Sequence, residues 1–228
     1  MPDGPRSGPS TSDASGSPDS GDGADLRRAI GYPAHLEVDE CLRDGSIARF
    51  RPILPTDGDA LVVFHDGLTP RSVYRRFFFT HPHLTRTEVD RFTHVDYVER
   101  MAFAVLEGDR IIGVGRYEQL PPGTEAEVAF VVTDDHQHLG IGTLLLDHLA
   151  DVARVHGVDR FVAQTLSENR EMLGVFLSSG FPVETSASAG TVAIRFPIET
   201  GENYLAARAS RRDRAGVGDP PSPGRAGR

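Results

Sequence analysis

The sequence predicts an α+β fold, a mixed, mostly antiparallel sheet of six to seven strands with helices on both faces. Two hairpin patterns and one crossover support this prediction. The hairpins are alternating apolar runs that flank Asp44-Gly45 and the turn 107–109, and such turns join antiparallel neighbours. The crossover is a strand, a long helix and a second strand between residues 126 and 166, an order that makes two strands parallel.

Period-two alternation marks the strands, and Gly, Pro and Asp mark the turns between them. The expected strands are 35–42, 47–53, 101–106, 110–118, 126–132, 160–166, 182–186 and 191–196. Pro52 and Pro55 end the second strand, because proline cannot donate to a sheet ladder.

Apolar residues at helical spacing mark the helices. Thr56 and Asp57 are expected to cap a helix that carries Leu61, Phe64 and Leu68, and Thr69-Pro70 to begin the next. A short helix is expected over 87–95. The strongest helix, 140–156, ends at Gly157, and the last helical segment follows Ser167 and ends at Gly180.

Composition limits the folded part to one domain, expected over residues 26–205. Residues 1–25 are almost entirely Gly, Ser, Pro and Asp, and residues 206–228 are mainly Arg, Gly, Pro and Ala. Such segments bury too little apolar surface to offset the entropy of ordering them. Both tails are therefore expected to be disordered.

Charge and composition exclude several functions. A net charge of −9 disfavours a broad nucleic-acid interface. No apolar run is long enough to span a bilayer and no signal peptide is recognisable, so a cytoplasmic location without membrane contact is expected. Cys41 is the single cysteine and His81-Pro-His83 has no further ligands near it in sequence, so no metal is expected. The oligomeric state is left open.

The junction from Val132 to Thr143 has the most informative chemistry. Its sequence is Val-Thr-Asp-Asp-His-Gln-His-Leu-Gly-Ile-Gly-Thr, a strand end followed by a loop and a helix start. A helix N-terminus has free N–H donors, and Gly140 and Gly142 allow close approach of a ligand. We therefore expect an anion-binding site. It is not a P-loop, because the chain contains no lysine.

Gln137-His-Leu-Gly-Ile-Gly142 resembles the pyrophosphate loop of the GNAT superfamily of acyl-CoA-dependent N-acyltransferases, which reads Gln/Arg-x-x-Gly-x-Gly/Ala. The resemblance covers about residues 42–197 and includes Arg49-Phe-Arg-Pro-Ile with Asp57, the strand 127–132, Asn169 and Gly180-Phe181. In particular, the chain resembles actinobacterial protein-lysine acetyltransferases of the Pat type. The resemblance implies a GNAT-like fold, acetyl-CoA as co-substrate and an amine acceptor.

The resemblance also implies which residues bind the co-substrate. In the family, the strand before the loop has a bulge and splays from its neighbour, so that the pantetheine arm pairs with exposed backbone. The implied cofactor-binding residues are Phe130, Val131, Val132, Gln137, His138, Leu139, Gly140, Ile141, Gly142, Thr143 and Asn169. Many relatives have a basic residue in the loop where this chain has His138-Leu139, so one cationic contact to the pyrophosphate is absent there.

Catalysis needs a base, because an amine arrives mostly as ammonium. The family-matched candidate is Glu127, with Glu125 as its competitor. A backbone N–H of the splayed strand, such as that of Phe130, is expected to bind the oxyanion. The tyrosine that often protonates the leaving thiolate is replaced by Phe176, which a thiol leaving group tolerates. His136 and His138 are expected to be solvated.

The expected activity is therefore direct transfer of acetyl from acetyl-CoA to an amine, with protein lysine as the favoured acceptor. The acidic net charge slightly favours cationic acceptors. Three alternatives remain: a small-molecule amine acetyltransferase, a non-catalytic acyl-CoA-sensing module and a scaffold that binds no CoA.

Overall fold

The computed structural model describes residues 27–28 and 30–214. A short unit ends at Gly31, and a compact unit begins at Tyr32. The expected N-terminal tail, residues 1–25, lies outside the described residues, as do residues 215–228. Within the described ranges, no helix is long and apolar enough to cross a membrane.

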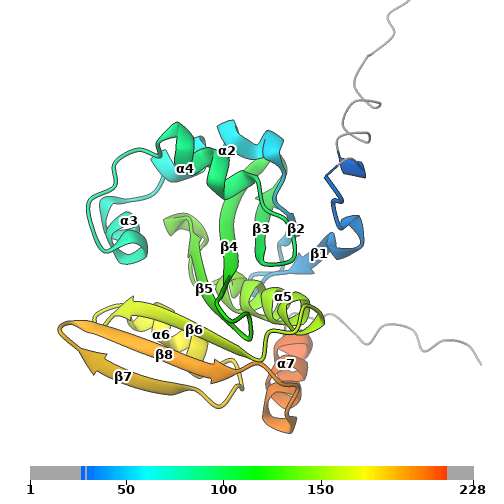
Figure 1. Ribbon diagram of the computed structural model, residues 1–228, viewed down its shortest axis with the longest axis vertical. Helices are drawn as coiled ribbons and strands as arrows, with labels where there is room; N and C mark the ends of the chain where they lie inside the picture. Colours follow the sequence, from blue (N-terminus) through cyan, green and yellow to red (C-terminus); the bar gives the residue numbers. More distant parts are fainter. Residues whose placement is uncertain (1–26, 29, 215–228) are drawn as a thin grey trace, which may run out of the picture. The chain divides into compact units, whose positions relative to one another are not determined.

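One sheet contains eight strands in the order β1-β2-β3-β4-β5-β6-β8-β7 (Figure 1). The strands are β1 (Val38–Cys41), β2 (Ile47–Pro52), β3 (Arg100–Glu107), β4 (Arg110–Leu120), β5 (Glu125–Val132), β6 (Arg160–Leu166), β7 (Glu184–Ser188) and β8 (Thr191–Pro197). Only β5 and β6 are parallel neighbours. The fold class is confirmed, but the count of six to seven strands was too low, because all eight expected segments pair, including the fully exposed edge strand β7.

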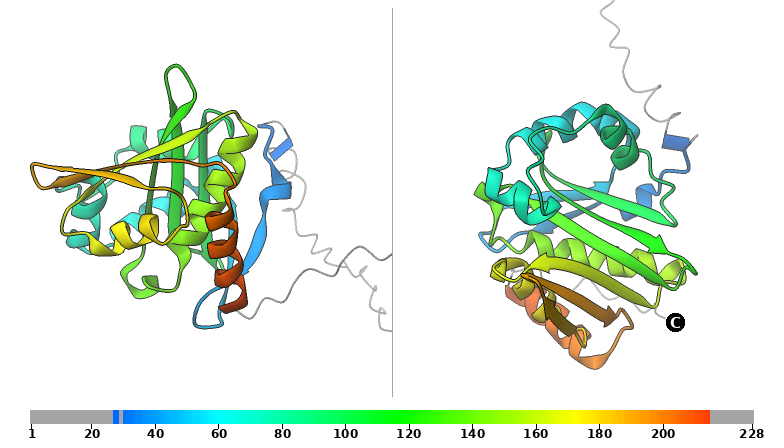
Figure 2. Two further views of the ribbon diagram at one scale, coloured as in Figure 1. Left: turned by 90° about the horizontal axis from the view of Figure 1, so that it is seen from below. Right: turned by 60° about the vertical axis from the view of Figure 1, so that its left-hand side comes forward.

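Six α-helices are described, with three short 3₁₀ turns between elements. The helices are α2 (Gly58–Asp66), α3 (Pro70–Phe77), α4 (Arg86–Thr93), α5 (Ile141–Val155), α6 (Arg170–Leu177) and α7 (Glu202–Arg214), and the turns are η1 (Ala34–Leu36), η2 (Pro55–Asp57) and η3 (Asp134–His136). Helices α2 to α4 lie on one side of the central strands and α5 on the other (Figure 2).

The two faces of β4 contact different helices because alternate residues point in opposite directions. A Cβ on Gly115 would lie 3.1 Å from Cδ2 of Leu145, so a glycine there lets α5 pack closely on the sheet. On the opposite face, Val114 packs in an apolar cluster with Leu61 and Phe64 of α2. The sheet therefore separates a core under α5 from a core under α2 to α4.

Asp57 is the N-cap residue of α2, as expected, but its side chain makes no capping hydrogen bond to that helix. Its carboxylate accepts the Leu54 N–H at 2.7 Å and two hydrogen bonds from Arg51, both at 2.7 Å. A bidentate guanidinium is a stronger partner for a carboxylate than a helix N–H. Asp57 therefore ties the end of β2 to the chain entering α2.

Residues 206–214 belong to helix α7, so the expectation that the C-terminal tail is disordered from residue 206 was wrong. Arg211 Nη2 donates to both oxygens of Asp147 in α5 at 2.9 Å, and Arg208 donates to Asp151 at 2.6 Å. Tyr204 stacks on Phe181 at 4.3 Å. The segment lacked apolar periodicity because α7 docks on α5 largely through ion pairs, and their acidic partners are distant in sequence.

We expect Arg211→Met to lower the free energy of unfolding by about 3 kcal/mol, because it leaves the buried Asp147 carboxylate without its partner. Urea denaturation measures this change. Arg212→Met is the matched control, since Arg212 lies on the same helix and is exposed, and it should change stability by less than about 0.5 kcal/mol. Equal stability of the two variants would contradict this role of Arg211.

His65 is a buried ring without a hydrogen-bond partner in the described structure. It is 3% exposed, and its ring packs against Phe77 at 5.7 Å and His81 at 5.5 Å between centroids. Burial lowers the pKa of His65; the charge of His81 lowers it further, whereas Asp66 and Glu88 oppose the shift. The folded protein therefore favours the neutral ring.

This shift makes stability depend on pH. The unfolded chain binds a proton at His65 more readily than the folded protein does. The stability that comes from keeping His65 neutral is therefore complete above the unfolded pKa of about 6.5 and is lost as pH falls below it. We expect His65→Phe to lose less stability than the wild type between pH 7.5 and pH 5.5 in urea denaturation. The control His83→Gln changes a highly exposed histidine that contacts Asp66. Its loss of stability between pH 7.5 and pH 5.5 should equal that of the wild type. Parallel pH profiles for all three proteins would exclude a contribution from His65.

Candidate functional site

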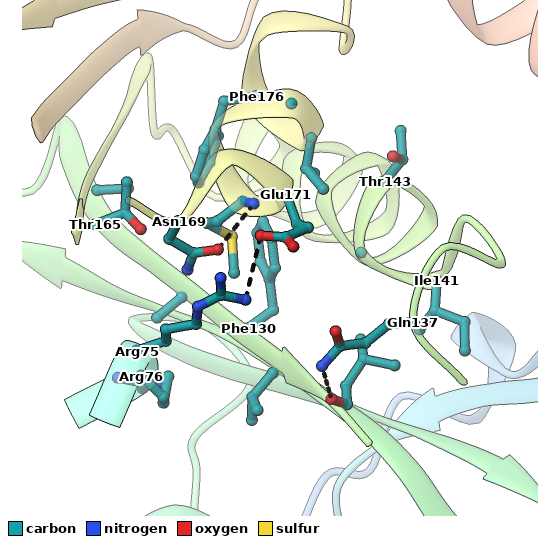
Figure 3. A pocket seen from close by; sticks show the side chains of 18 of the residues that line it. Arg75, Arg76, Phe130, Gln137, Ile141, Thr143, Thr165, Asn169, Glu171 and Phe176 are labelled. Carbon is teal, nitrogen blue, oxygen red and sulfur yellow. Dashed lines mark hydrogen bonds and ion pairs between the residues drawn. The ribbon is translucent and has the colours of Figure 1, made fainter. Parts of the chain in front are cut away.

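A cavity of about 380 Å³ opens where β5 and β6 separate. The two strands pair only from Glu125↔Arg160 to Glu127↔Val162, although both continue beyond these positions. The lining comes from α3, β5, the loop before α5, β6 and α6 (Figure 3). The expected splay of β5 is therefore confirmed.

Beyond Glu127, β5 has backbone groups that β6 does not pair. Thr133 N–H donates to Ile112 O at 2.9 Å, and Val132 lies opposite Gly113 in the register with β4. Because strand N–H groups alternate in direction, those of Phe130 and Val132 point away from β4, towards the cavity. The register of β4 and β5 has no shift along its length, so the expected bulge in β5 is absent and the departure of β6 alone exposes these groups.

The N-terminus of α5 also borders the cavity. Gly140 precedes the helix with a φ of +92°, a conformation that glycine adopts without strain. Among the described residues, no acceptor is found for the N–H groups of Ile141 and Gly142. Two free donors at the positive end of a 15-residue helix favour a bound anion.

Most of the expected cofactor-binding residues line this cavity. They are Phe130, Val131, Val132, Gln137, His138, Gly140, Ile141, Gly142, Thr143 and Asn169. Leu139 is the one expected residue that is not among those lining the cavity. Its carbonyl instead accepts the backbone N–H of Arg43 at 3.1 Å, because the turn between β1 and β2 lies against this loop.

The turn between β1 and β2 also brings the side chain of Arg43 to the cavity, which the sequence did not predict. The Arg43 side chain lines the cavity and crosses Gly140, where a Cβ would lie 3.3 Å from Arg43 Nε. Arg43 Nη1 donates to His138 O at 3.4 Å. The guanidinium of Arg43, which lies 95 residues before His138 in the chain, is thus held beside the loop that has no basic residue at His138-Leu139. Nothing in the local sequence of a hairpin turn indicates this contact.

Hydrogen bonds connect the loop before α5 to α3. Ser72 Oγ donates to Asp134 at 2.7 Å, and Gln137 Nε2 lies 3.4 Å from both Ser72 Oγ and Val132 O. His136 is not solvated as expected, since its ring contacts Asp135 at 2.8 Å and Glu107 at 3.4 Å. His138 is exposed. The contacts with Asp135 and Glu107 fix the ring of His136 within the loop before α5.

The two candidate bases have different surroundings. Glu127 is exposed and lines the cavity. Glu125 accepts hydrogen bonds from Arg160 at 3.0 Å and Arg195 at 2.8 Å, and the first of these lowers its pKa most. A carboxylate engaged by two guanidinium groups is a poor proton acceptor. Glu127 is therefore the better candidate base.

Aromatic rings and an amide form the floor of the cavity. Phe130 lies 5.4 Å from Phe176, which packs at 5.7 Å from Phe196. Phe176 has no hydroxyl, in agreement with the expected lack of a tyrosine acid. Asn169 is buried, and its Oδ1 accepts the Met172 N–H at 3.3 Å, so it caps α6 and orients the loop before it.

An ion pair spans the cavity from α3 to α6. Arg75 Nη1 lies 3.2 Å from Glu171 Oε2 (Figure 3). Arg76, the next residue of α3, also lines the cavity. Sequence reasoning missed all three residues because their helices are almost 100 residues apart. In the described part of the chain, no group of three or more His, Cys, Asp or Glu side chains is arranged to hold a metal ion.

Comparisons with known proteins agree with this geometry. Residues 71–181 match the Acetyltransferase (GNAT) family. The chain is 30% identical over 146 residues to an acetyltransferase of Pseudomonas aeruginosa, covering 62% of this chain and 78% of that protein. It is 33% identical over 134 residues to the acetyltransferase Pat of Mycolicibacterium smegmatis. This match covers 58% of this chain but only 40% of Pat.

A solved structure is also similar. The crystal structure of the GNAT domain of S. lividans PAT is 41% identical, with a TM-score of 0.69, and the match covers 73% of this chain and 99% of that domain. The family match over residues 71–181 includes β5, the loop before α5, β6 and α6, which border the cavity. The chain therefore belongs to the GNAT family of acetyltransferases.

Proposed function

We propose that this enzyme transfers an acetyl group from acetyl-CoA directly to the side-chain amine of a lysine in a protein, with Glu127 as the base. The proposal rests on one observation, the separation of β5 from β6 beside the N-terminus of α5 and the carboxylate of Glu127. The similarity to Pat-type enzymes supports lysine as the acceptor.

The residues of the cavity suit acetyl-CoA. Phosphates match the free N–H groups of Ile141 and Gly142 and the guanidinium of Arg43. The backbone N–H groups of Phe130 and Val132, which β6 does not pair, suit the amide-containing pantetheine arm, as an added strand pairs with a sheet edge. When bound, acetyl-CoA supplies the acetyl group as a reactive thioester.

Each residue then has a defined part in the transfer. Glu127 takes the proton of the acceptor ammonium, directly or through one water, so that the amine can attack. As the nitrogen–carbon bond forms and the carbon–sulfur bond breaks, the Phe130 N–H donates to the carbonyl oxygen, where negative charge develops. Without a tyrosine at position 176, the sulfur leaves as thiolate and takes the second proton, which the nitrogen loses as the amide forms, while Glu127 releases the first proton to water.

The acceptor is tested by incubating the protein with radiolabelled acetyl-CoA and a lysate of the organism that encodes it, then identifying labelled peptides by mass spectrometry. Because the chain has no lysine, it adds no labelled lysine of its own. Labelled lysines that disappear with Glu127→Gln support the proposal. Binding of acetyl-CoA without any protein labelling would exclude a protein acceptor and leave a small amine or an acyl-CoA sensor.

We expect Glu127→Gln to lower kcat about 100-fold, because general bases contribute on this scale. The dissociation constant for acetyl-CoA should stay unchanged, since the carboxylate does not face the phosphates. Thiol release measures kcat, and calorimetry measures binding. Glu125→Gln is the control and should retain kcat, since Glu125 is engaged by Arg160 and Arg195. A fully active Glu127→Gln would exclude Glu127 as the base.

We expect Arg43→Gln to weaken acetyl-CoA binding about 10-fold, because a charged hydrogen bond to phosphate is lost. S-acetylpantetheine, which lacks the diphosphate, should bind equally to both proteins, and calorimetry with the two ligands separates the effects. Arg110→Gln is the control, since Arg110 pairs with Asp135 in the same loop and does not line the cavity. Equal weakening for both ligands would indicate a general distortion instead.

A further inference from the structure

Two arginines lie on the face of the sheet that carries Glu127. Arg76 lies in the last turn of α3 and lines the cavity with Glu127. Arg116 of β4 lies opposite Ala129, two residues along β5 from Glu127. In residues 30–214, neither guanidinium has a hydrogen bond or an ion pair within 4.0 Å. Their close partners are rings, with Arg116 Cζ at 3.8 Å from the Phe92 centroid and Arg76 Cζ at 5.1 Å from that of Phe77.

The carboxylates nearby do not balance these cations. Glu118 lies opposite Glu127 and is bound by Arg91 at 2.8 Å. Glu127 attracts Arg76 but has to remain available as the base. Three arginines and two glutamates leave one excess positive charge, and the excess becomes two when Glu127 accepts a proton.

Burial makes this excess costly. It lowers the pKa of Arg76, and it lowers that of Arg116 to about 9, with repulsion from Arg76 as the next cause. Two partly buried cations that repel each other are stabilised when an anion binds between them. The arrangement is therefore suited to a ligand that brings a negative charge beside the base.

The phosphates of the co-substrate do not meet this need. Their binding groups are at the other end of the cavity, at Arg43 and the start of α5. Ser72 of α3 contacts Gln137 in that loop, whereas Arg76 lies one helical turn, about 6 Å, further along α3. The end of the cavity near Arg76 and Glu127 is where the acceptor amine has to arrive.

We propose that Arg76, supported by Arg116, binds a carboxylate of the acceptor, so that the preferred acceptor is a lysine with an acidic neighbour in its sequence. This inference rests on the proposed function. It reverses the expectation from net charge, because the acidic residues that give −9 are distributed over the whole chain whereas the charges at this site are locally positive.

Anion binding is tested first without catalysis. The full-length protein is saturated with CoA to fill the phosphate site and titrated with glutarate at constant ionic strength, and the thermal midpoint is followed. We expect glutarate to raise the midpoint of the wild type and of Arg71→Gln, but not that of Arg76→Gln. Arg71 is the matched control because it lies on the same helix, is exposed and does not line the cavity. No rise in the wild type overturns the proposal.

Acceptor preference is then measured with two peptides that differ only in the residues beside one lysine, glutamate in one and glutamine in the other. The wild type and Arg71→Gln should favour the glutamate peptide about 10-fold in kcat/KM, the scale of one charged hydrogen bond. Arg76→Gln should lose this preference, because its kcat/KM falls more on the glutamate peptide than on the glutamine peptide. An equal loss on both peptides would show that Arg76 acts on the transfer itself and would overturn the inference.

The two assays separate the inference from the function on which it rests. If glutarate binds through Arg76 but neither peptide is acetylated, the carboxylate subsite is supported and the protein-lysine assignment fails. If free glutamate is acetylated instead, the anion is that of a small amino acid, and the lysine part of the proposal is overturned.

Discussion

The early end of the β5–β6 pairing is the constraint on which the site depends. Only three residue pairs join these strands, so the sheet remains continuous but opens beyond Glu127 and Val162. Phe130 and Phe176 occupy the space between them and provide an apolar floor. The same opening leaves backbone donors of β5 free, places Glu127 at its edge and lets the start of α5 border the cavity.

The charges around this opening are divided between its two ends. At one end, Arg43 and the N-terminus of α5 supply positive potential where phosphates are proposed to bind. At the other end, Arg76 and Arg116 surround the proposed base. The Arg75–Glu171 pair lies between them and joins α3 to α6 across the cavity. Helix α3 therefore contributes to both ends, through Ser72 near the loop and Arg76 near Glu127.

Ion pairs between distant segments also explain why the sequence predicted a disordered tail from residue 206, where the structure has helix α7. The residues of α7 show no apolar stripe, yet Arg208 and Arg211 fasten the helix to acids of α5. Asp57 differed from expectation for a related reason, since Arg51 competes for its carboxylate more strongly than a helix N–H does. The partners of α7 lie far away in sequence, whereas Arg51 lies only six residues before Asp57 and competes through its bidentate geometry.

Apart from Glu127, which the family resemblance supplied as the candidate base, the sequence by itself determined the strands, the long helix α5 and the glycine loop before it. These features depend on periodicity, backbone freedom and residue type, which are local properties. Only the tertiary structure decided that the Arg43 side chain lies beside Gly140 and that Arg76 comes to line the same cavity as Glu127. Each of these facts requires chain segments far apart in sequence to lie within a few ångströms of one another, and no local pattern records which segments meet.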